Sequence, residues 1–203
     1  MGLKCFLVKP AFRANRSLRR YSTRDAPCSV GSYHNAHTPL AVVPITLDGD
    51  HWKMPAADEI PHDDPRWPAH CQCGHEFTEA DAWQVFDDPI YVDDGGHEYS
   101  LRNLVPGMMW DEFWAPDWMK GPDGRSLQVV CPDGHTWSID GQASNCTAPE
   151  DREHRCWTRT GEPPLISVGK AWGKTCSAGA GSIATPGYHG FLGINGAAPG
   201  EFT

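Results

Sequence analysis

The 203-residue sequence lacks any long apolar run. No stretch approaches the roughly 20 apolar residues that a membrane-spanning helix needs, so we expect no membrane partner. The start of the chain has only a short apolar run before Lys9 and Pro10, whereas the core of a secretory signal needs about 7–15 apolar residues. The sequence therefore predicts an intracellular location.

Several motifs of catalysis and nucleotide binding are also missing. The chain has neither a GxxxxGK[ST] phosphate-binding loop nor an HExxH metalloprotease motif. Residues 179–182 (GAGS) lack the GxSxG form of a nucleophile elbow, because Ala184 stands where the second glycine belongs. These motifs therefore assign no reaction, and the sequence leaves open whether the chain is an enzyme.

Leucine and isoleucine are few, whereas the chain has 21 glycines, 18 prolines and nine tryptophans. Glycine and proline favour turns, and tryptophan supplies large buried area to a small core. We predict one mostly β, loop-rich α+β domain with one or two short helices, held together by metal sites. The helices are expected near 80–86, where Thr78 and Asp81 have the spacing of a capping box, and near 110–118.

Strands are predicted where short apolar runs lie between turn residues. A hairpin is expected around a glycine-rich turn at 93–96, and a second one joins 127–130 to 136–139. Residues 121–124 (GPDG) and 131–134 (CPDG) repeat one turn signature. Further strands are expected at 40–46, 165–168 and 188–194.

Charge is distributed unevenly around a net value of −9. Residues 1–24 hold seven basic side chains and no acid, and we predict that they form a basic N-terminal segment. Residues 25–70 are proline-rich and predicted to be an irregular wrap, and 71–203 are predicted to be the β-rich body. Nucleic-acid contact is expected only through residues 1–24, because the acidic remainder repels phosphate. The alternative, which we favour, is that the segment lies on the acidic body or stays solvated.

The eight cysteines are the strongest chemical signal. In Cys71-Gln-Cys73-Gly74-His75, two thiolates one residue apart can face the same ion, and the glycine allows a tight turn. A tetrahedral zinc needs two more ligands, for which we favour Cys28 and His34, with His75 as a substitute. Such a site would attach the proline-rich segment to the body. Free buried thiols are the alternative.

A second group comprises Cys146, His154, Cys156 and Cys176. These residues are of the right kinds for a second zinc, although their spacing is irregular. A Cys146–Cys156 disulfide or unpaired core cysteines are the alternatives, and Cys131, followed by His135, is a substitute ligand. We interpret Cys5 as structural.

Ser182 and His189 form a candidate catalytic pair near the C-terminus. A three-residue loop would put them on opposite faces of a hairpin. A two-residue turn at Pro186-Gly187 would make them diagonal neighbours on one face, and a four-residue loop at 184–187 would place them directly opposite each other. The preceding Gly-rich backbone could then stabilise an oxyanion, and Asp140 or Glu162 could orient the imidazole. The structural alternative is a packed histidine and a turn hydroxyl.

Several segments, among them CQCGHEFT, GPDGRSL, DGQASNCT and HRCW, resemble a family of uncharacterised proteins of tailed phages of actinobacteria. The resemblance covers nearly the whole chain and implies action in the host cytoplasm or in the virion. The stretch GSIATPGYHGFLGINGA also resembles the end of a bacterial domain of unknown function found beside ubiquitin-like conjugation operons, for which a peptidase role is proposed. That second resemblance covers about 20 residues and would make Ser182 and His189 catalytic, but Gly181 replaces its expected proline.

Together these observations lead to two hypotheses. The first is a zinc-stabilised phage accessory or structural protein that acts by binding another protein. The second is a small hydrolase, peptidase-like, that uses Ser182 and His189.

Overall fold

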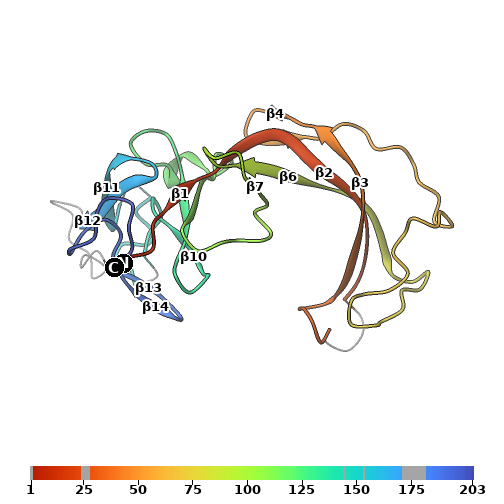
Figure 1. The fold of residues 1–203 in the computed structure, drawn as a ribbon. Coiled ribbons are helices and arrows are strands. Elements are labelled where there is room, and N and C mark those ends of the chain that lie inside the picture. The colour runs from red at the N-terminus through yellow and green to blue at the C-terminus, as the bar shows by residue number, and fades with distance from the viewer. Residues whose placement is uncertain (1, 24–27, 144, 153, 171–181) are drawn as a thin grey trace. The chain divides into compact units, whose positions relative to one another are not determined.

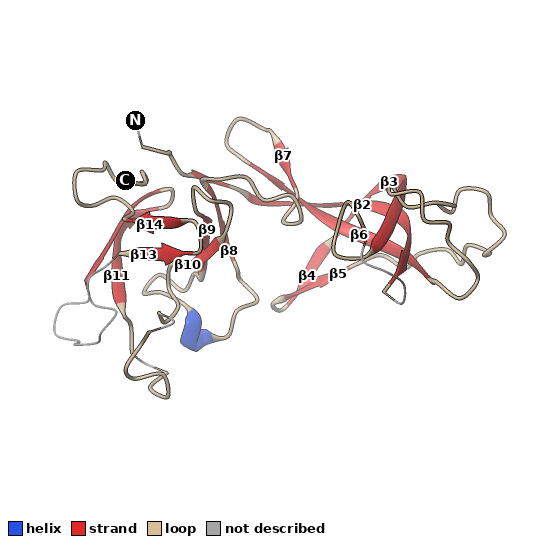
Figure 2. Ribbon diagram, turned by 90° about the horizontal axis from the view of Figure 1, so that it is seen from below, coloured by secondary structure: helices blue, strands red, loops and turns tan. Residues whose placement is uncertain are grey.

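The structure is a computed structural model that describes residues 2–23, 28–143, 145–152, 154–170 and 182–203. Strands form almost all of its regular structure, and the 3-10 helix η1 (Asp117–Met119) is the only helical element within those ranges (Figure 2). None of the helical structure described there is long and apolar enough to cross a membrane. The prediction of a mostly β, loop-rich chain is confirmed.

The chain divides into two compact units. One unit comprises Met1–Lys9 and Tyr91–Thr203, and the other comprises Pro10–Ile90. We call them the body unit and the insert unit.

The insert unit is built on two long antiparallel strands, β2 (Lys9–Ser22) and β3 (His34–Pro44), which run side by side in Figure 1. Their register runs from Arg13 opposite Pro44 to Ser22 opposite His34 and is interrupted by one irregularity after Arg16. Strand β6 (Ala82–Val92) follows β2 in the sheet order β3-β2-β6-β7. A separate hairpin joins β4 (Thr46–Asp48) to β5 (His51–Lys53).

Two expectations for this unit need correction. Residues 25–70 are more regular than predicted, because β3 is longer than the strand expected at 40–46 and is followed by β4 and β5. The helix expected near 80–86 is instead the start of β6, although Asp81 does accept the hydrogen bond from the Thr78 N–H (2.7 Å) that suggested a helix cap. The bond closes a turn, and the following residues extend because they join the sheet beside β2.

The body unit contains a four-stranded sheet in the order β1-β8-β9-β10. Its strands are β1 (Phe6–Leu7), β8 (Met108–Asp111), β9 (Leu127–Val130) and β10 (Thr136–Ser138). Strand β1 is parallel to β8, and the other pairs are antiparallel. The second expected helix, near 110–118, is therefore β8 followed by the three-residue η1.

Three hairpins complete the regular structure. They pair β11 (Trp157–Glu162) with β12 (Leu165–Lys170), β13 (Ile183–Thr185) with β14 (Tyr188–Gly190), and the end of β6 with β7 (Glu98–Tyr99). The hairpins predicted around 93–96 and between 127 and 139 are thereby confirmed.

The repeated turn signature forms the same structure twice. In residues 121–125 and 131–135, the first N–H donates to the fifth carbonyl (2.7 and 2.8 Å) and the fourth N–H donates to the first carbonyl (3.0 and 2.9 Å). The fourth residue, Gly124 or Gly134, has φ of +77° or +85°, where an L side chain is strained. Glycine at this position therefore fixes both turns.

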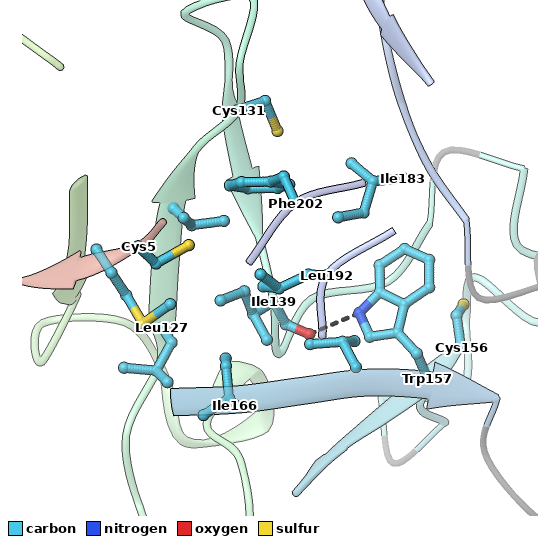
Figure 3. Close-up of a cluster of buried hydrophobic side chains, with 13 residues drawn as sticks. Cys5, Leu127, Cys131, Ile139, Cys156, Trp157, Ile166, Ile183, Leu192 and Phe202 are labelled. Atoms are coloured by element: carbon cyan, nitrogen blue, oxygen red, sulfur yellow. Dashed lines mark hydrogen bonds between the residues drawn. The ribbon is translucent and has the colours of Figure 1, made fainter. Parts of the chain in front are cut away.

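The core of the body unit lies between its sheet and the two C-terminal hairpins (Figure 3). Trp157 is buried in this core and donates its indole N–H to the carbonyl of Ile139 (2.6 Å). Cys5 and Cys131 are also buried there, and burial raises the pKa of each thiol to about 12. Both are therefore neutral packing residues at pH 7, as expected for Cys5.

Candidate metal centres

Four of the predicted ligands come together in the insert unit. The candidate ligand atoms of Cys28, His34, Cys71 and Cys73 all lie within 4.8 Å of one another. The Sγ atoms of Cys28 and Cys71 are 3.7 Å apart, and Nδ1 of His34 is 3.2 Å from Sγ of Cys73. This grouping matches the set preferred from sequence, and it could hold one metal ion. We call it the first cluster.

The main chain around Cys71 and Cys73 folds into a tight turn that presents both thiols. The N–H of Cys71 donates to the carbonyl of His75 (2.8 Å), and the N–H of Gly74 donates to the carbonyl of Cys71 (2.9 Å). Gly74 has φ of +91°, which an L side chain rarely adopts. The turn therefore has the same form as those at 121–125 and 131–135, with two thiols added.

Main-chain donors favour the charged form of Cys71. Burial raises the pKa of this thiol, but hydrogen bonds from the N–H groups of Cys73 and Asn35 outweigh burial and lower it to about 6. At Cys73 the N–H of His75 lowers the pKa, whereas burial and the thiols of Cys28 and Cys71 raise it, and the net direction is upward. Three thiols that share one site repel one another once charged, and a bound cation would remove that repulsion.

The first cluster is enclosed by its own small core. Cys28, His34 and Cys71 are buried, Cys73 is half-buried, and Phe77 and Ala36 pack against the thiols. The ring of His75 stacks on the ring of His34 with centroids 3.9 Å apart and an interplanar angle of 10°. His75, the substitute ligand suggested by the sequence, therefore lies against a ligand and is not one of the four.

This arrangement predicts different effects for the two histidines. Replacing His34 (His34→Ala) removes one of the four candidate ligands, so we expect the affinity for added zinc to fall by more than 100-fold. Replacing His75 (His75→Ala) removes only a ring that orients His34, for which a loss of about 10–100-fold is typical. Competition with a chromogenic zinc chelator measures both affinities. Equal losses in the two variants would contradict the assignment of His34 over His75.

A second cluster lies in the body unit. The candidate ligand atoms of Cys146, His154 and Cys156 lie within 4.8 Å of one another. Nε2 of His154 is buried and has no hydrogen-bond partner in the described part of the chain, as expected for an atom positioned to bind a metal. The fourth residue predicted from sequence, Cys176, lies outside the described residues.

Main-chain N–H groups also support the second cluster. The N–H of Ala143 donates to Sγ of Cys156, and the N–H of Ala148 donates to Sγ of Cys146 (both 3.3 Å). The cysteines that the structure describes form no disulfide, so the alternative Cys146–Cys156 bond is not observed. Cys131 belongs to neither cluster. These donors are the main-chain N–H groups of two alanines, and every residue except proline carries such a group. The sequence therefore gives no signal that identifies them.

The donor sets limit which ions can bind. Thiolate and imidazole suit borderline and soft cations such as zinc, whereas magnesium and calcium require oxygen ligands. Three sulfurs and one nitrogen complete a tetrahedral shell in the first cluster, so an ion there would have no open position for substrate. The first cluster is therefore suited to a structural role.

The C-terminal hairpin places Ser182 and His189 in one of the alternative arrangements. Thr185 pairs with Tyr188 and Ala184 pairs with His189, so the turn is the two-residue Pro186-Gly187 and Ser182 precedes the pairing. This register makes Ser182 and His189 diagonal neighbours, but no hydrogen bond joins them in the described part of the chain. Most of the glycine-rich segment before Ser182 lies outside the described residues. The catalytic pair stays a prediction.

One of the two proposed orienting carboxylates, Asp140, is engaged elsewhere. Asp140 accepts hydrogen bonds from Nε of Arg159 (2.8 Å) and from the N–H of Leu127 (2.9 Å), one on each oxygen. It therefore supports the body unit, and it is not available to hold the imidazole of His189.

Several basic side chains of residues 1–24 contact acids of the same chain. Lys4 pairs with Glu201 (3.7 Å), Lys9 with Asp94 (3.3 Å) and Arg16 with Asp87 (2.8 Å). Arg20 is buried, and its guanidinium carbon lies 3.6 Å from the ring centroid of Trp83. This arrangement agrees with the interpretation that the segment lies on its own acidic chain. Nucleic-acid binding through it stays a prediction.

Comparison of the chain with protein-family models, curated proteins and solved structures finds no match.

Proposed function

We propose that this chain is a zinc-stabilised accessory or structural protein that acts by binding another protein, with one zinc ion in each unit. The first cluster carries the proposal, because its four converging ligands suit a closed tetrahedral zinc site. Its ligands come from residues 28–34, which lead into β3, and from the turn at residues 71–73, which is remote in sequence. A metal there would add its binding free energy to the small apolar cluster that connects these two segments.

The second cluster extends the proposal to the body unit, with Cys176 as the proposed fourth ligand. Binding is favoured over hydrolysis because His189 is exposed and makes no hydrogen bond to Ser182 in the described structure. In keeping with the resemblance to phage proteins, we place the chain in the host cytoplasm or in the virion.

Cobalt substitution tests the structural role. Cobalt(II) in a closed tetrahedral site gives visible bands that report on its ligands, and a closed site has no position for an added anion. We expect the bands of the cobalt-loaded variant Cys146→Ser/Cys156→Ser, which keeps only the first cluster, to be unchanged by azide. A shift on addition of azide would show an open coordination position, and it would point to a reactive metal instead of a structural one.

A further inference from the structure

A groove in the insert unit lies outside both metal clusters. It has a volume of about 440 Å³ and lies among β3, β6 and the loop at 57–61. Leu40 and Val43 of β3, Val85 of β6 and Ile60 of the loop give it apolar walls, and all four side chains are half-buried. The groove is therefore partly shielded from water and still open at its rim.

One arginine fixes the loop that forms the groove. The guanidinium of Arg16 donates to both oxygens of Asp87 (2.8 Å each) and to the carbonyls of Pro55 (2.6 Å) and Ala56 (3.2 Å). The side chains of Arg16 and Asp87 are largely buried, so this bond network attaches the loop firmly to the sheet. The groove is thus a built feature of the unit.

The rim of the groove carries two exposed carboxylates. Arg16 and Arg66 line the groove, but Arg16 is bonded to Asp87 and Arg66 forms a two-point bond with Asp64 (2.9 and 2.7 Å). The two lining carboxylates, those of Asp58 and Glu59, are exposed and form no hydrogen bond or ion pair within the described residues, although the charge of Asp58 acts on Arg16. The lining itself holds two arginines and two carboxylates; when Asp87 and Asp64, which bond the two arginines, are counted as well, the groove and its immediate surroundings carry a net charge of −2.

We propose that this groove binds a lysine or arginine side chain from a basic segment of a partner protein. Such a side chain has an apolar stem and a charged head, which match the apolar walls and the Asp58/Glu59 rim respectively. The net charge of −9 on the whole chain would attract a basic partner from a distance. The inference rests on the proposed function and specifies its partner as basic.

The test uses the full-length, zinc-loaded chain and fluorescein-labelled octalysine, followed by fluorescence anisotropy at low salt. We expect octalysine to bind and octaglutamate not to bind. In the variant Asp58→Asn/Glu59→Gln, octalysine should bind about five- to tenfold more weakly, the size expected for two exposed ion pairs. Absence of octalysine binding at low salt would overturn the proposal.

The matched control is Asp48→Asn/Asp50→Asn, which removes the same charge from the exposed β4–β5 hairpin of the same unit. The affinity of this control for octalysine should stay within twofold of that of the native chain. An equal loss of affinity in both double variants would show that the attraction is unspecific, and it would overturn the proposal that the groove binds the basic side chain. If Ile60→Ser loses octalysine binding and Asp63→Asn keeps it, the result supports the role of the apolar wall in binding the stem of the basic side chain. Metal content and circular dichroism are measured on the same samples. A folded, metal-loaded chain that does not bind octalysine contradicts only this inference. A chain that contains no metal contradicts the proposed function.

Discussion

Removing the proposed zinc from the first cluster is expected to unfold residues 10–90 while the body unit stays folded. Outside its long strands the insert unit is rich in loops, and its buried apolar side chains are few, among them Leu18, Ile45 and Phe77. Structural zinc contributes about 10–16 kcal/mol of apparent binding free energy, which is comparable to the whole stability of a small domain. The variant Cys71→Ser should therefore lose the folded insert unit even when zinc is present.

Hydrogen exchange read by mass spectrometry resolves the two units. In Cys71→Ser, amides of β2 and β3 should lose protection, and those of β9 and β12 should keep it. The control is Cys131→Ser, which alters a buried thiol of the body unit that belongs to neither cluster. That substitution should leave the protection of β2 and β3 unchanged. Native protection of β2 and β3 in Cys71→Ser would contradict a metal-held insert unit.

The variant Arg159→Met is expected to destabilise the body unit by about 3–5 kcal/mol, the usual cost of leaving one partner of a buried ion pair uncompensated. The side chains of Arg159 and Asp140 are only 4% and 5% exposed, and a bond of 2.8 Å joins them. Arg159 also bonds both oxygens of Asp123 in the turn at 121–125. The substitution keeps much of the side-chain volume but leaves the buried carboxylate of Asp140 without its cation.

Urea unfolding, followed by the fluorescence of the tryptophans, measures this loss. The matched control is Arg125→Met, because Arg125 makes a longer, more exposed pair with Asp123 (3.9 Å). An exposed pair of that kind is worth at most about 1 kcal/mol. If Arg159→Met and Arg125→Met shift the urea midpoint equally, the buried pair of Arg159 and Asp140 does not contribute the stability that its geometry predicts.

Local sequence patterns predicted the features that depend on local chemistry. The turns at 121–125 and 131–135 follow from glycine at the position with positive φ, and the hairpins follow from apolar runs beside those turns. The first cluster was predictable because Cys71 and Cys73 are separated by one residue and because Cys28 and His34 lie close together in sequence. These signals need no knowledge of the remote parts of the chain.

The features that depend on remote partners could not be predicted. The sequence predicts that the basic segment lies on the acidic body or stays solvated, but it does not predict the long strand β2, in which Arg16 lies beside Asp87 of β6 and Arg20 packs on Trp83. The alternation of apolar and polar residues that identifies a half-buried strand is therefore absent here, because charged side chains occupy positions where they contact residues remote in sequence. The helix expected near residue 80 was wrong for the same reason, because pairing with the sheet outweighed a local cap.

The metal content of the purified chain, measured by native mass spectrometry and repeated after chelation, tests the central claim most directly. We predict two zinc ions per chain, with one lost in Cys71→Ser and the other lost in Cys156→Ser. A folded chain that carries no metal, and whose cysteines all react with a thiol reagent without loss of structure, would contradict the account.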